Sequence, residues 1–266
     1  MFLPKILEML LSFVIPTFNR ACKVRRAINS VLKQVEDTTL TEIVVVDDGS
    51  TDGTEDQLES LVSEKQIRLI KHTENSGVAA AKNTGILNST NKYIVLLDSD
   101  DLLEDGGLVY LIDLVQKNEY DLIFSGTRLL RNGTLLYDPS FRGFKRYEDL
   151  LSRSIGEYLP ICRSEVLQKF LLRDLRGFES ITWLSIAKRG YKVFYDSTPI
   201  RSYDDEGDDR LSNRIGIIKN SEFMKKGYSV YLNEFGGDLK KHNLKEYLIL
   251  NTKYLCYYVM QKAFVH

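Results

Sequence analysis

Cysteine and histidine are scarce in this sequence, with three of each among 266 residues. The cysteines, Cys22, Cys162 and Cys256, are odd in number and widely spaced, which argues against a disulfide framework and a cysteine zinc site. The histidines are scattered as well, so we expect no histidine-based metal cluster or catalytic triad. This composition favours a reducing, cytoplasmic setting. If a metal binds, carboxylates are expected to hold it.

Excess charge and long apolar runs are also missing. The chain has 36 basic and 37 acidic residues, so it creates no overall field that would collect nucleic acid, and no nucleic-acid partner is expected. The apolar opening is interrupted by Lys5 and Glu8 and is too short for a spanning helix, and it does not have the pattern of a signal peptide. The first expected strand begins just after Met9, which makes Met9 a candidate start of the chain.

The first half of the chain repeats a short apolar run, a Gly or Asp turn and a helical segment. Apolar residues recur at helical spacing over residues 24–35 and 108–115. The apolar runs lack alternation, as expected for parallel strands that are covered on both faces. The pattern predicts an α/β fold with a mostly parallel sheet flanked by helices. Four of its strands are expected at residues 10–15, 42–46, 67–71 and 93–97.

From about Asp121 the pattern becomes mixed. Asn132-Gly133 lies between two strand-like runs, residues 127–130 and 134–137, which predicts a tight hairpin. A helix at 181–188 and a strand at 191–195 are expected next, followed by an acidic loop. The tail from Arg214 onward predicts helices and carries nine basic residues against four acidic ones. We therefore expect a mixed α+β segment over 126–213 and a C-terminal helical appendage over 214–266.

Polar turns follow the predicted strands, at the edge where open parallel sheets bind ligands. Asp98 and Asp100 are two residues apart, so both side chains can point into one cavity while Ser99 points away. Hard cations such as Mg²⁺ or Mn²⁺ take carboxylate oxygens and complete their shell with substrate phosphates and water. Asp98 and Asp100 are therefore a candidate metal site. The alternative is a solvated turn and helix cap, because Asp favours both.

Two further segments are candidates for binding a nucleotide. Asp48, after the second strand, can accept a hydrogen bond from a base N–H or a ribose hydroxyl. Residues 75–85 form a small-residue helix start that allows close packing beside a nucleotide, with Lys82 supplying charge. Ordinary turn chemistry and a plain alanine-rich helix are the alternatives for these segments.

Four motifs in order carry a resemblance to a known family: Phe13–Arg20, Val44–Asp52, Asn75–Gly85 and Leu96–Asp101. Together they resemble family 2 glycosyltransferases with the GT-A fold, a Rossmann-like sheet, over residues 10–125. The resemblance implies a nucleotide-sugar-binding half over 1–125 and an acceptor-binding and catalytic half over 126–213. It implies contacts to a nucleotide-sugar donor, with a UDP-sugar favoured, from Pro16, Thr17, Asn19, Asp48, Asn75, Lys82, Asp98, Ser99 and Arg210.

Two departures from the family pattern stand out. The family often has Arg where Lys82 stands, and Lys lacks the planar fork of Arg. The family usually has an acidic pair before an aromatic-containing helix, whereas this chain keeps one acid, Glu179, ahead of Trp183. The resemblance implies that Glu179 is the catalytic base; the alternative is a first-turn Glu favoured by the helix dipole. Trp183 is a candidate for acceptor stacking or for the core.

The implied chemistry is transfer with inversion. A single base deprotonates the acceptor hydroxyl as it attacks opposite the leaving diphosphate. Mn²⁺ or Mg²⁺ neutralises the charge that grows on that diphosphate. Residues 208–213 resemble a family segment that closes over the diphosphate, with Arg210 as a candidate phosphate clamp, although a surface turn is the alternative.

The expected acceptor is a glycan or a lipid-diphosphate-linked sugar, because family members of this kind assemble bacterial surface polysaccharides such as O-antigen or capsule. The stretch 247–265 is rich in Tyr, Leu and Lys. Peripheral contact of these C-terminal helices with the inner face of the cytoplasmic membrane is one expectation, and packing on the domain is the other.

Two other classes of function stay open. A sugar nucleotidyltransferase would also need carboxylates and a metal, but its expected glycine-rich basic loop is not found in the sequence. A dehydrogenase is disfavoured because no G-x-G-x-x-G follows the first strand. A catalytically silent domain that binds nucleotide-sugars or glycans would have no need to combine Asp98, Asp100 and Glu179.

Overall fold

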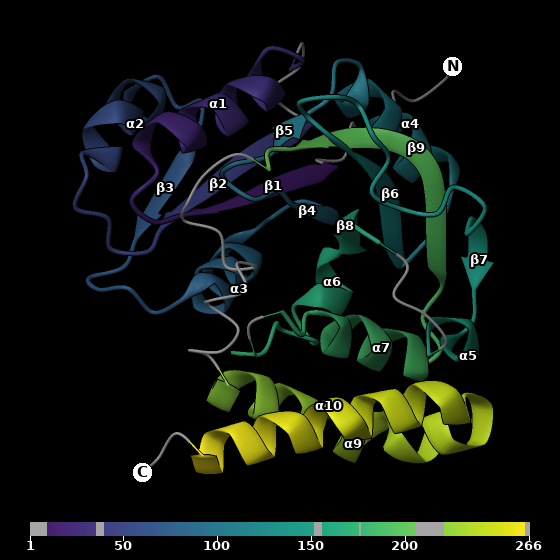
Figure 1. The fold of residues 1–266 in the computed structure, drawn as a ribbon. Helices are drawn as coiled ribbons and strands as arrows, with labels where there is room; N and C mark the ends of the chain where they lie inside the picture. The colour runs from purple at the N-terminus through teal and green to yellow at the C-terminus, as the bar shows by residue number, and fades with distance from the viewer. Residues whose placement is uncertain (1–9, 36–39, 152–155, 176, 206–220, 264–266) are drawn as a thin grey trace. The chain divides into compact units, whose positions relative to one another are not determined.

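The chain forms two compact units, seen here in a computed structural model (Figure 1). The structure describes residues 10–35, 40–151, 156–175, 177–205 and 221–263. The first unit contains Met1–Phe144, Ile155–Leu172 and Tyr191–Asp205, and the second contains Lys145–Ser154, Arg173–Gly190 and Glu206–His266. The functional division that we expected at residues 125 and 213 stays a prediction.

A twisted mixed sheet forms the centre of the first unit. Its strands run in the order β3-β2-β1-β4-β8-β6-β9-β5, and β7 pairs with β9 beside this path. The pairs β1–β2, β2–β3, β1–β4 and β6–β9 are parallel, whereas β8 is antiparallel to both of its neighbours. The strands are β1 Leu11–Thr17, β2 Thr41–Asp47, β3 Arg68–Lys71, β4 Tyr93–Leu96, β5 Leu102–Leu103, β6 Leu122–Leu129, β7 Gly143–Lys145, β8 Tyr158–Arg163 and β9 Val193–Tyr203.

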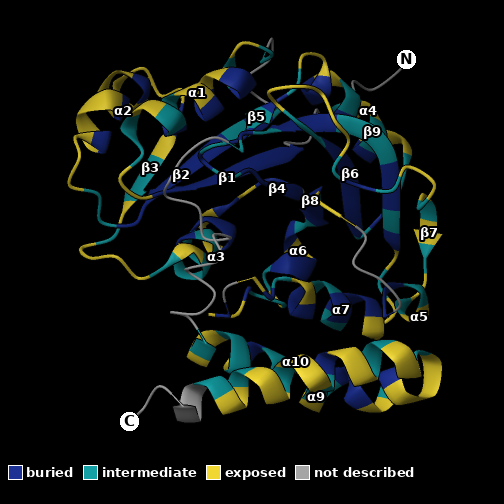
Figure 2. Ribbon diagram, in the orientation of Figure 1, coloured by how far each residue is buried: buried dark blue, intermediate teal, exposed yellow. Residues whose placement is uncertain are grey.

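Alternate residues of the central strands pack on opposite faces of the sheet. Phe13 and Ile15 belong to the large core, which also holds the apolar stripes of three helices. Val44 and Val46 face the other way and pack against Ala81 of α3. Figure 2 shows β1, β2 and β4 buried, so the predicted parallel sheet covered on both faces is confirmed. The helices of this unit are α1 Ala21–Leu32, α2 Thr54–Ser63, α3 Val78–Asn88, α4 Gly107–Lys117 and α6 Ser164–Leu167.

The predicted Asn132-Gly133 turn is present, but its second strand is not continuous. The N–H of Gly133 donates to the carbonyl of Leu129 at 2.8 Å, and the N–H of Leu129 donates to that of Thr134 at 2.8 Å. The returning chain keeps only isolated bridges, at Leu135 and Tyr137. Since β8 and β9 already flank most of β6, only the end of β6 is open to the returning chain. The strand expected at 134–137 is therefore wrong as a continuous element.

Helices make up most of the described part of the second unit. They are α5 Tyr147–Leu150, α7 Ser180–Lys188, α9 Ser221–His242 and α10 Leu244–Ala263. The expected helix at 181–188 and the C-terminal helical appendage are thus confirmed. Asn243 links the last two helices and caps α10, because its Oδ1 accepts a hydrogen bond from the Glu246 N–H at 3.1 Å. None of the described helices is both long enough and apolar enough to cross a membrane.

Asp238 of α9 joins three helices of this unit. It lies 2.7 Å from the ammonium of Lys188, and the hydroxyl of Tyr147 donates to the same carboxylate at 2.7 Å. The hydrogen bond from Lys188 and the one from Tyr147 hold the pKa of Asp238 below its usual value. Helices α5 and α7 are therefore tied to α9 by a shared carboxylate as well as by apolar packing.

Phe178 depends on a glycine of α9 for its position. A Cβ atom added at Gly227 would lie 2.2 Å from the Phe178 ring, which also packs edge-on against Tyr228 with centroids 5.0 Å apart. Phe178 directly precedes Glu179, so this contact fixes the segment that carries the predicted base. By contrast, a Cβ at Gly237 would meet no atom within 4 Å.

Replacing the two glycines by alanine should therefore have opposite effects on stability. Gly227→Ala should lower the free energy of unfolding by about 1–2 kcal/mol, because overpacking costs about 1–3 kcal/mol and exceeds the gain in helix propensity. Gly237→Ala should raise it by up to about 1 kcal/mol. Urea unfolding followed by circular dichroism measures both. Equal stabilisation of the two variants would contradict the close packing of Phe178 on α9.

Candidate active site

The carboxyl ends of β1, β2 and β4 meet at one edge of the sheet. The parallel register places Thr17 opposite Asp47, and the N–H of Asp48 donates to the Thr17 carbonyl at 2.9 Å. On the other side of β1, the N–H of Leu97 donates to the carbonyl of Val14 at 3.1 Å. The predicted polar turns at 16–20, 47–53 and 98–101 therefore lie next to one another, and we call this edge the rim.

Asn19 joins two turns of the rim. Its backbone has a φ of 52°, and its N–H donates to Oγ of Ser50 at 2.8 Å. Its side-chain oxygen accepts the N–H of Thr51 at 2.8 Å. Pro16 and Thr17 beside it are buried, and the Thr17 hydroxyl has no hydrogen-bond partner among the described residues. The side-chain oxygen of Asn19 is thus already used to connect the turns, whereas the Thr17 hydroxyl remains to be satisfied.

Asp48 is almost fully buried and organises the turn before α3. Its two oxygens accept the N–H groups of Ser76 at 3.0 Å and Gly77 at 2.8 Å. Gly49 lets the two turns come together, because its φ is +80° and a Cβ there would lie 2.8 Å from the backbone carbon of Glu74. Asn75, on the same turn, is exposed. Asp48 therefore positions the backbone beside the predicted nucleoside site.

Exposed and buried side chains alternate along the acidic turn after β4. The side chains of Asp98 and Asp100 are 38% and 23% exposed, whereas Ser99 and Asp101 are buried. Each exposed carboxylate has its own cation. Lys82 of α3 lies 2.7 Å from Asp98, and Arg20, just before α1, lies 2.7 Å from Asp100. Sequence patterns alone do not indicate the role of Arg20, because its partner Asp100 lies 80 residues further along the chain.

The charges around this turn shift its carboxyl groups in opposite directions. Partial burial would raise the pKa of Asp98, but Lys82, with help from Arg201 and Arg20, lowers it below its usual value. Burial raises the pKa of Asp100, and Arg20 opposes this rise. Asp98 therefore carries negative charge more readily than Asp100 does.

The two carboxylates fit a hard divalent cation that is shared with a bound diphosphate. Among the described residues, no group of three or more His, Cys, Asp or Glu could hold a metal ion. Mg²⁺-type sites in phosphate-handling enzymes need only one or two carboxylates, since phosphate oxygens and water fill the other positions. Asp98 and Asp100 supply that number of carboxylates. When no ligand is bound, Lys82 and Arg20 balance their negative charge.

A buried ion pair supports the acidic turn from below. Arg201 of β9 lies 3.2 Å from Asp101, with side-chain exposures of 5% and 0%. The Nε of Arg201 also donates to the hydroxyl of Thr127 at 2.9 Å. Burial raises the pKa of Asp101, and the Arg201 guanidinium opposes that rise. Removing one partner of such a pair costs about 3–5 kcal/mol, so Asp101 and Arg201 fix the turn to β9 and β6.

The remaining predicted residues come later in the sequence than the three turns of the rim. Glu179 and Trp183 belong to the second unit, where Glu179 is the residue before α7 and is half-buried. The carbonyl of Glu179 accepts the N–H of Thr182 at 3.0 Å, so its backbone begins the helix. Arg210 lies outside the described residues. The roles of Glu179, Trp183 and Arg210 stay predictions.

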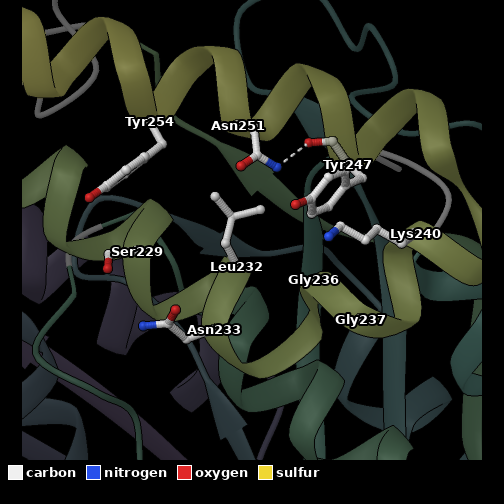
Figure 3. A pocket seen from close by; sticks show the side chains of 9 residues that line it. All are labelled: Ser229, Leu232, Asn233, Gly236, Gly237, Lys240, Tyr247, Asn251 and Tyr254. Carbon is white, nitrogen blue, oxygen red and sulfur yellow. Dashed lines mark hydrogen bonds between the residues drawn. The ribbon is translucent and has the colours of Figure 1, made fainter.

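The second unit has a cavity of its own, of about 300 Å³, between α9 and α10 (Figure 3). Tyr247, Asn251 and Tyr254 line it from α10, and the amide of Asn251 donates to the Tyr247 carbonyl at 2.8 Å. The ammonium of Lys240 lies 4.8 Å from the centre of the Tyr247 ring. From α9 the lining residues are Ser229, Leu232, Asn233, Gly236, Gly237 and Lys240.

Known proteins resemble this chain in sequence and in fold. A Campylobacter jejuni protein named GalNAc(5)-diNAcBac-PP-undecaprenol beta-1,3-glucosyltransferase is 27% identical over 248 residues, which cover 89% of this chain and 77% of that protein. Staphylococcus aureus TarS 1-349 in complex with UDP-GlcNAc matches with a TM-score of 0.68 at 19% identity, covering 96% of this chain and 73% of that one.

A second solved structure gives the same fold. A mannosyltransferase from Pyrobaculum calidifontis, in complex with GDP-Man and Mn²⁺, matches with a TM-score of 0.64 at 18% identity and covers 96% of this chain and 75% of that one. The likeness to these structures establishes the expected GT-A fold. Residues 12–174 match the family model described as Glycosyl transferase family 2, which is more than half of the chain. This chain therefore belongs to glycosyltransferase family 2.

Proposed function

We propose that this chain transfers a sugar, with inversion, from a nucleotide-diphosphate donor to an acceptor hydroxyl, and that it requires Mn²⁺ or Mg²⁺. The observation that carries the proposal is the acidic turn at the rim. Its two partly exposed carboxylates, Asp98 and Asp100, stand beside Lys82 and Arg20 on a single edge of the sheet. This combination of charges suits a metal together with a diphosphate.

The nucleoside would bind along the ends of β1 and β2. Thr17 offers a buried hydroxyl without a partner among the described residues, and Asp48 offers a carboxylate that accepts N–H groups. A UDP-sugar is the favoured donor, since an acceptor-only carboxylate suits the ring N–H of a uracil. The TarS complex with UDP-GlcNAc, which shares the fold, supports this choice. Pro16, Asn19, Asn75 and Ser99 complete the proposed donor contacts.

The diphosphate would bind over the acidic turn. Asp98 and Asp100 would hold the metal, which when bound supplies positive charge to the departing diphosphate. Lys82 and Arg20 lie close enough to the same turn to share their charge with phosphate oxygens. Arg210 is proposed as a further phosphate clamp.

Glu179 is the proposed base. Its carboxylate takes the proton from the acceptor hydroxyl while that oxygen forms a bond to the anomeric carbon. The bond from this carbon to the donor diphosphate breaks on the opposite side, and the diphosphate leaves with the bonding electrons. One displacement inverts the configuration. Trp183 is proposed as a surface for the acceptor ring.

The proposed acceptor is a glycan or a lipid-diphosphate-linked sugar in bacterial surface-polysaccharide assembly. The C. jejuni relative is named for an undecaprenol-diphosphate acceptor and a beta linkage, which supports both the acceptor class and inversion. A silent binding domain is the competing account. The presence of Asp98, Asp100 and Glu179 in one chain favours the enzyme.

We also propose peripheral contact with the inner face of the cytoplasmic membrane through α10. Leu244, Leu248, Leu255 and Val259 are exposed and share one face of this helix. Lys245 and Lys253 are exposed on the same helix, whose one acidic residue is Glu246. A face of exposed apolar side chains on a helix with more basic than acidic residues suits a surface of anionic lipid.

Site-directed substitutions should separate the base from the metal ligands. Glu179→Gln should lower kcat by at least about 100-fold and leave donor affinity nearly unchanged, because it removes only the proton acceptor. Asp100→Asn should weaken donor binding as well as turnover. Nucleoside diphosphate release from a panel of nucleotide-sugars, with Mn²⁺ and an acceptor, measures turnover, and NMR of the product gives its anomeric configuration.

Two exposed carboxylates provide matched controls for these substitutions. Asp105, 86% exposed, controls for Asp100, and exposed Asp174 controls for Glu179. Both Asp→Asn controls should keep wild-type activity. Full activity of Glu179→Gln would show that Glu179 is not the base. If the wild type binds a donor but turns it over with none of the acceptors supplied, the silent binding domain becomes the better account.

Vesicle binding tests the membrane proposal. The double change Leu248→Glu with Leu255→Glu should weaken cosedimentation with vesicles containing anionic phosphatidylglycerol by at least about tenfold, since it places charge on the apolar face. Val109→Glu is the control, because Val109 is equally exposed on α4 of the first unit. Unchanged vesicle binding by the folded double variant would overturn the proposal.

A further inference from the structure

A continuous chain of side chains links Asp48 to α3 beneath the rim. His72, the residue after β3, has its Nδ1 2.7 Å from Oδ1 of Asp48 and its Nε2 2.9 Å from the hydroxyl of Thr84. The side chains of Asp48 and His72 are 4% and 18% exposed. The scattered histidines suggested no such cluster, yet the fold brings His72 between two residues distant in sequence.

The hydrogen-bond partners determine which ring nitrogen of His72 carries a proton. The backbone N–H groups of Ser76 and Gly77 donate to the two oxygens of Asp48, which marks the carboxylate as an acceptor. The Nδ1 of His72 must therefore carry a proton and donate it to Asp48. In the neutral ring, Nε2 is then the acceptor of the Thr84 hydroxyl.

Counting the acceptor positions leaves one for a ligand. A carboxylate has about four lone-pair sites. Oδ1 uses two of them, for the Ser76 N–H and for His72, and Oδ2 uses one for the Gly77 N–H. One site on Oδ2 remains, which suits a single donor group of a nucleobase.

The backbone of His72 is itself held in place. Its N–H donates to the carbonyl of Asp47 at 2.9 Å, which continues the pairing of β3 with β2. The ring is thus held on one side by Asp48, the residue after β2, and on the other side by Thr84 of α3. An imidazole with both ends fixed in this way holds the Asp48 carboxylate in one orientation.

We infer that His72 is a positioning residue for the donor site, which acts through Asp48 and sets the affinity for the nucleoside part of the donor. The inference rests on the proposed function, in which Asp48 contacts the nucleoside. Thr84 supports the same orientation from the far side of the ring. His72 acts on binding and takes no part in the proton transfer assigned to Glu179.

Calorimetric titration with nucleoside diphosphates and Mn²⁺ tests the inference without turnover. The probe is whichever of UDP, GDP and dTDP the wild-type chain binds. His72→Ala should raise its Kd by about tenfold, whereas His72→Asn should stay within about threefold of wild type, because an Asn side-chain N–H can replace Nδ1–H. Thr84→Val should give a smaller loss than His72→Ala. Thr73→Ala, at the exposed next residue, is the control and should bind as wild type does.

A double-mutant cycle separates positioning from a general effect on folding. In the background of Asp48→Asn, the added change His72→Ala should cause no further loss of affinity, because His72 acts only through that carboxylate. In the steady state, His72→Ala should raise the donor KM and leave kcat within about threefold. Thermal unfolding shows whether each variant is folded. If His72→Ala does not fold, the affinities of His72→Asn and Thr84→Val are compared with that of the wild type instead.

Each result leads to a distinct conclusion. If the wild type binds none of the three nucleotides, the proposed donor function fails, and the inference fails with it. If the wild type binds but folded His72→Ala binds equally well, the proposed function stands and the inference is overturned. Equal, additive losses from His72→Ala with and without Asp48→Asn would also overturn it, because His72 would then act elsewhere.

Discussion

The parallel pairing of β1 with β2 on one side and β4 on the other determines the rest of the first unit. It brings the carboxyl ends of three strands to the same edge of the sheet, and two of the turns that follow are joined by the hydrogen bond from the Asp48 N–H to the Thr17 carbonyl. The strands can be this apolar only because helices cover both faces of the sheet. The polar side chains of the turns after β1, β2 and β4 lie at the rim.

The rim concentrates negative charge and offsets it locally. Asp98 and Asp100 face cations from two different elements, α3 and the turn before α1, while Asp101 is neutralised by Arg201 from β9. Buried or half-buried carboxylates at this spacing would repel one another without such partners. In the proposed function, a diphosphate with a divalent metal carries both signs of charge, so it would bind between these groups while the net charge of the site stays small.

The strongest sequence signals came from segments whose structure is decided locally. Apolar runs such as Val44–Val46 and the helical stripe of α1 predicted the sheet and its cover correctly, and Asn132-Gly133 predicted its turn. The sequence could not predict β8, whose pairing with β4 and β6 depends on distant partners. The same limit explains why Arg20, His72 and Arg201 were missed: each binds a carboxylate that lies 24 to 100 residues away in the chain.

If a metal on the acidic turn holds the donor diphosphate, nucleotide binding must depend on that metal. Calorimetric titration of UDP into the wild-type chain, with Mn²⁺ and then with EDTA, compares the two states, and Asp98→Asn repeats the comparison without one of the carboxylates. EDTA should weaken UDP binding to the wild type by at least about tenfold and should change UDP binding to Asp98→Asn only slightly. Equal affinity of the wild type for UDP in Mn²⁺ and in EDTA would contradict it.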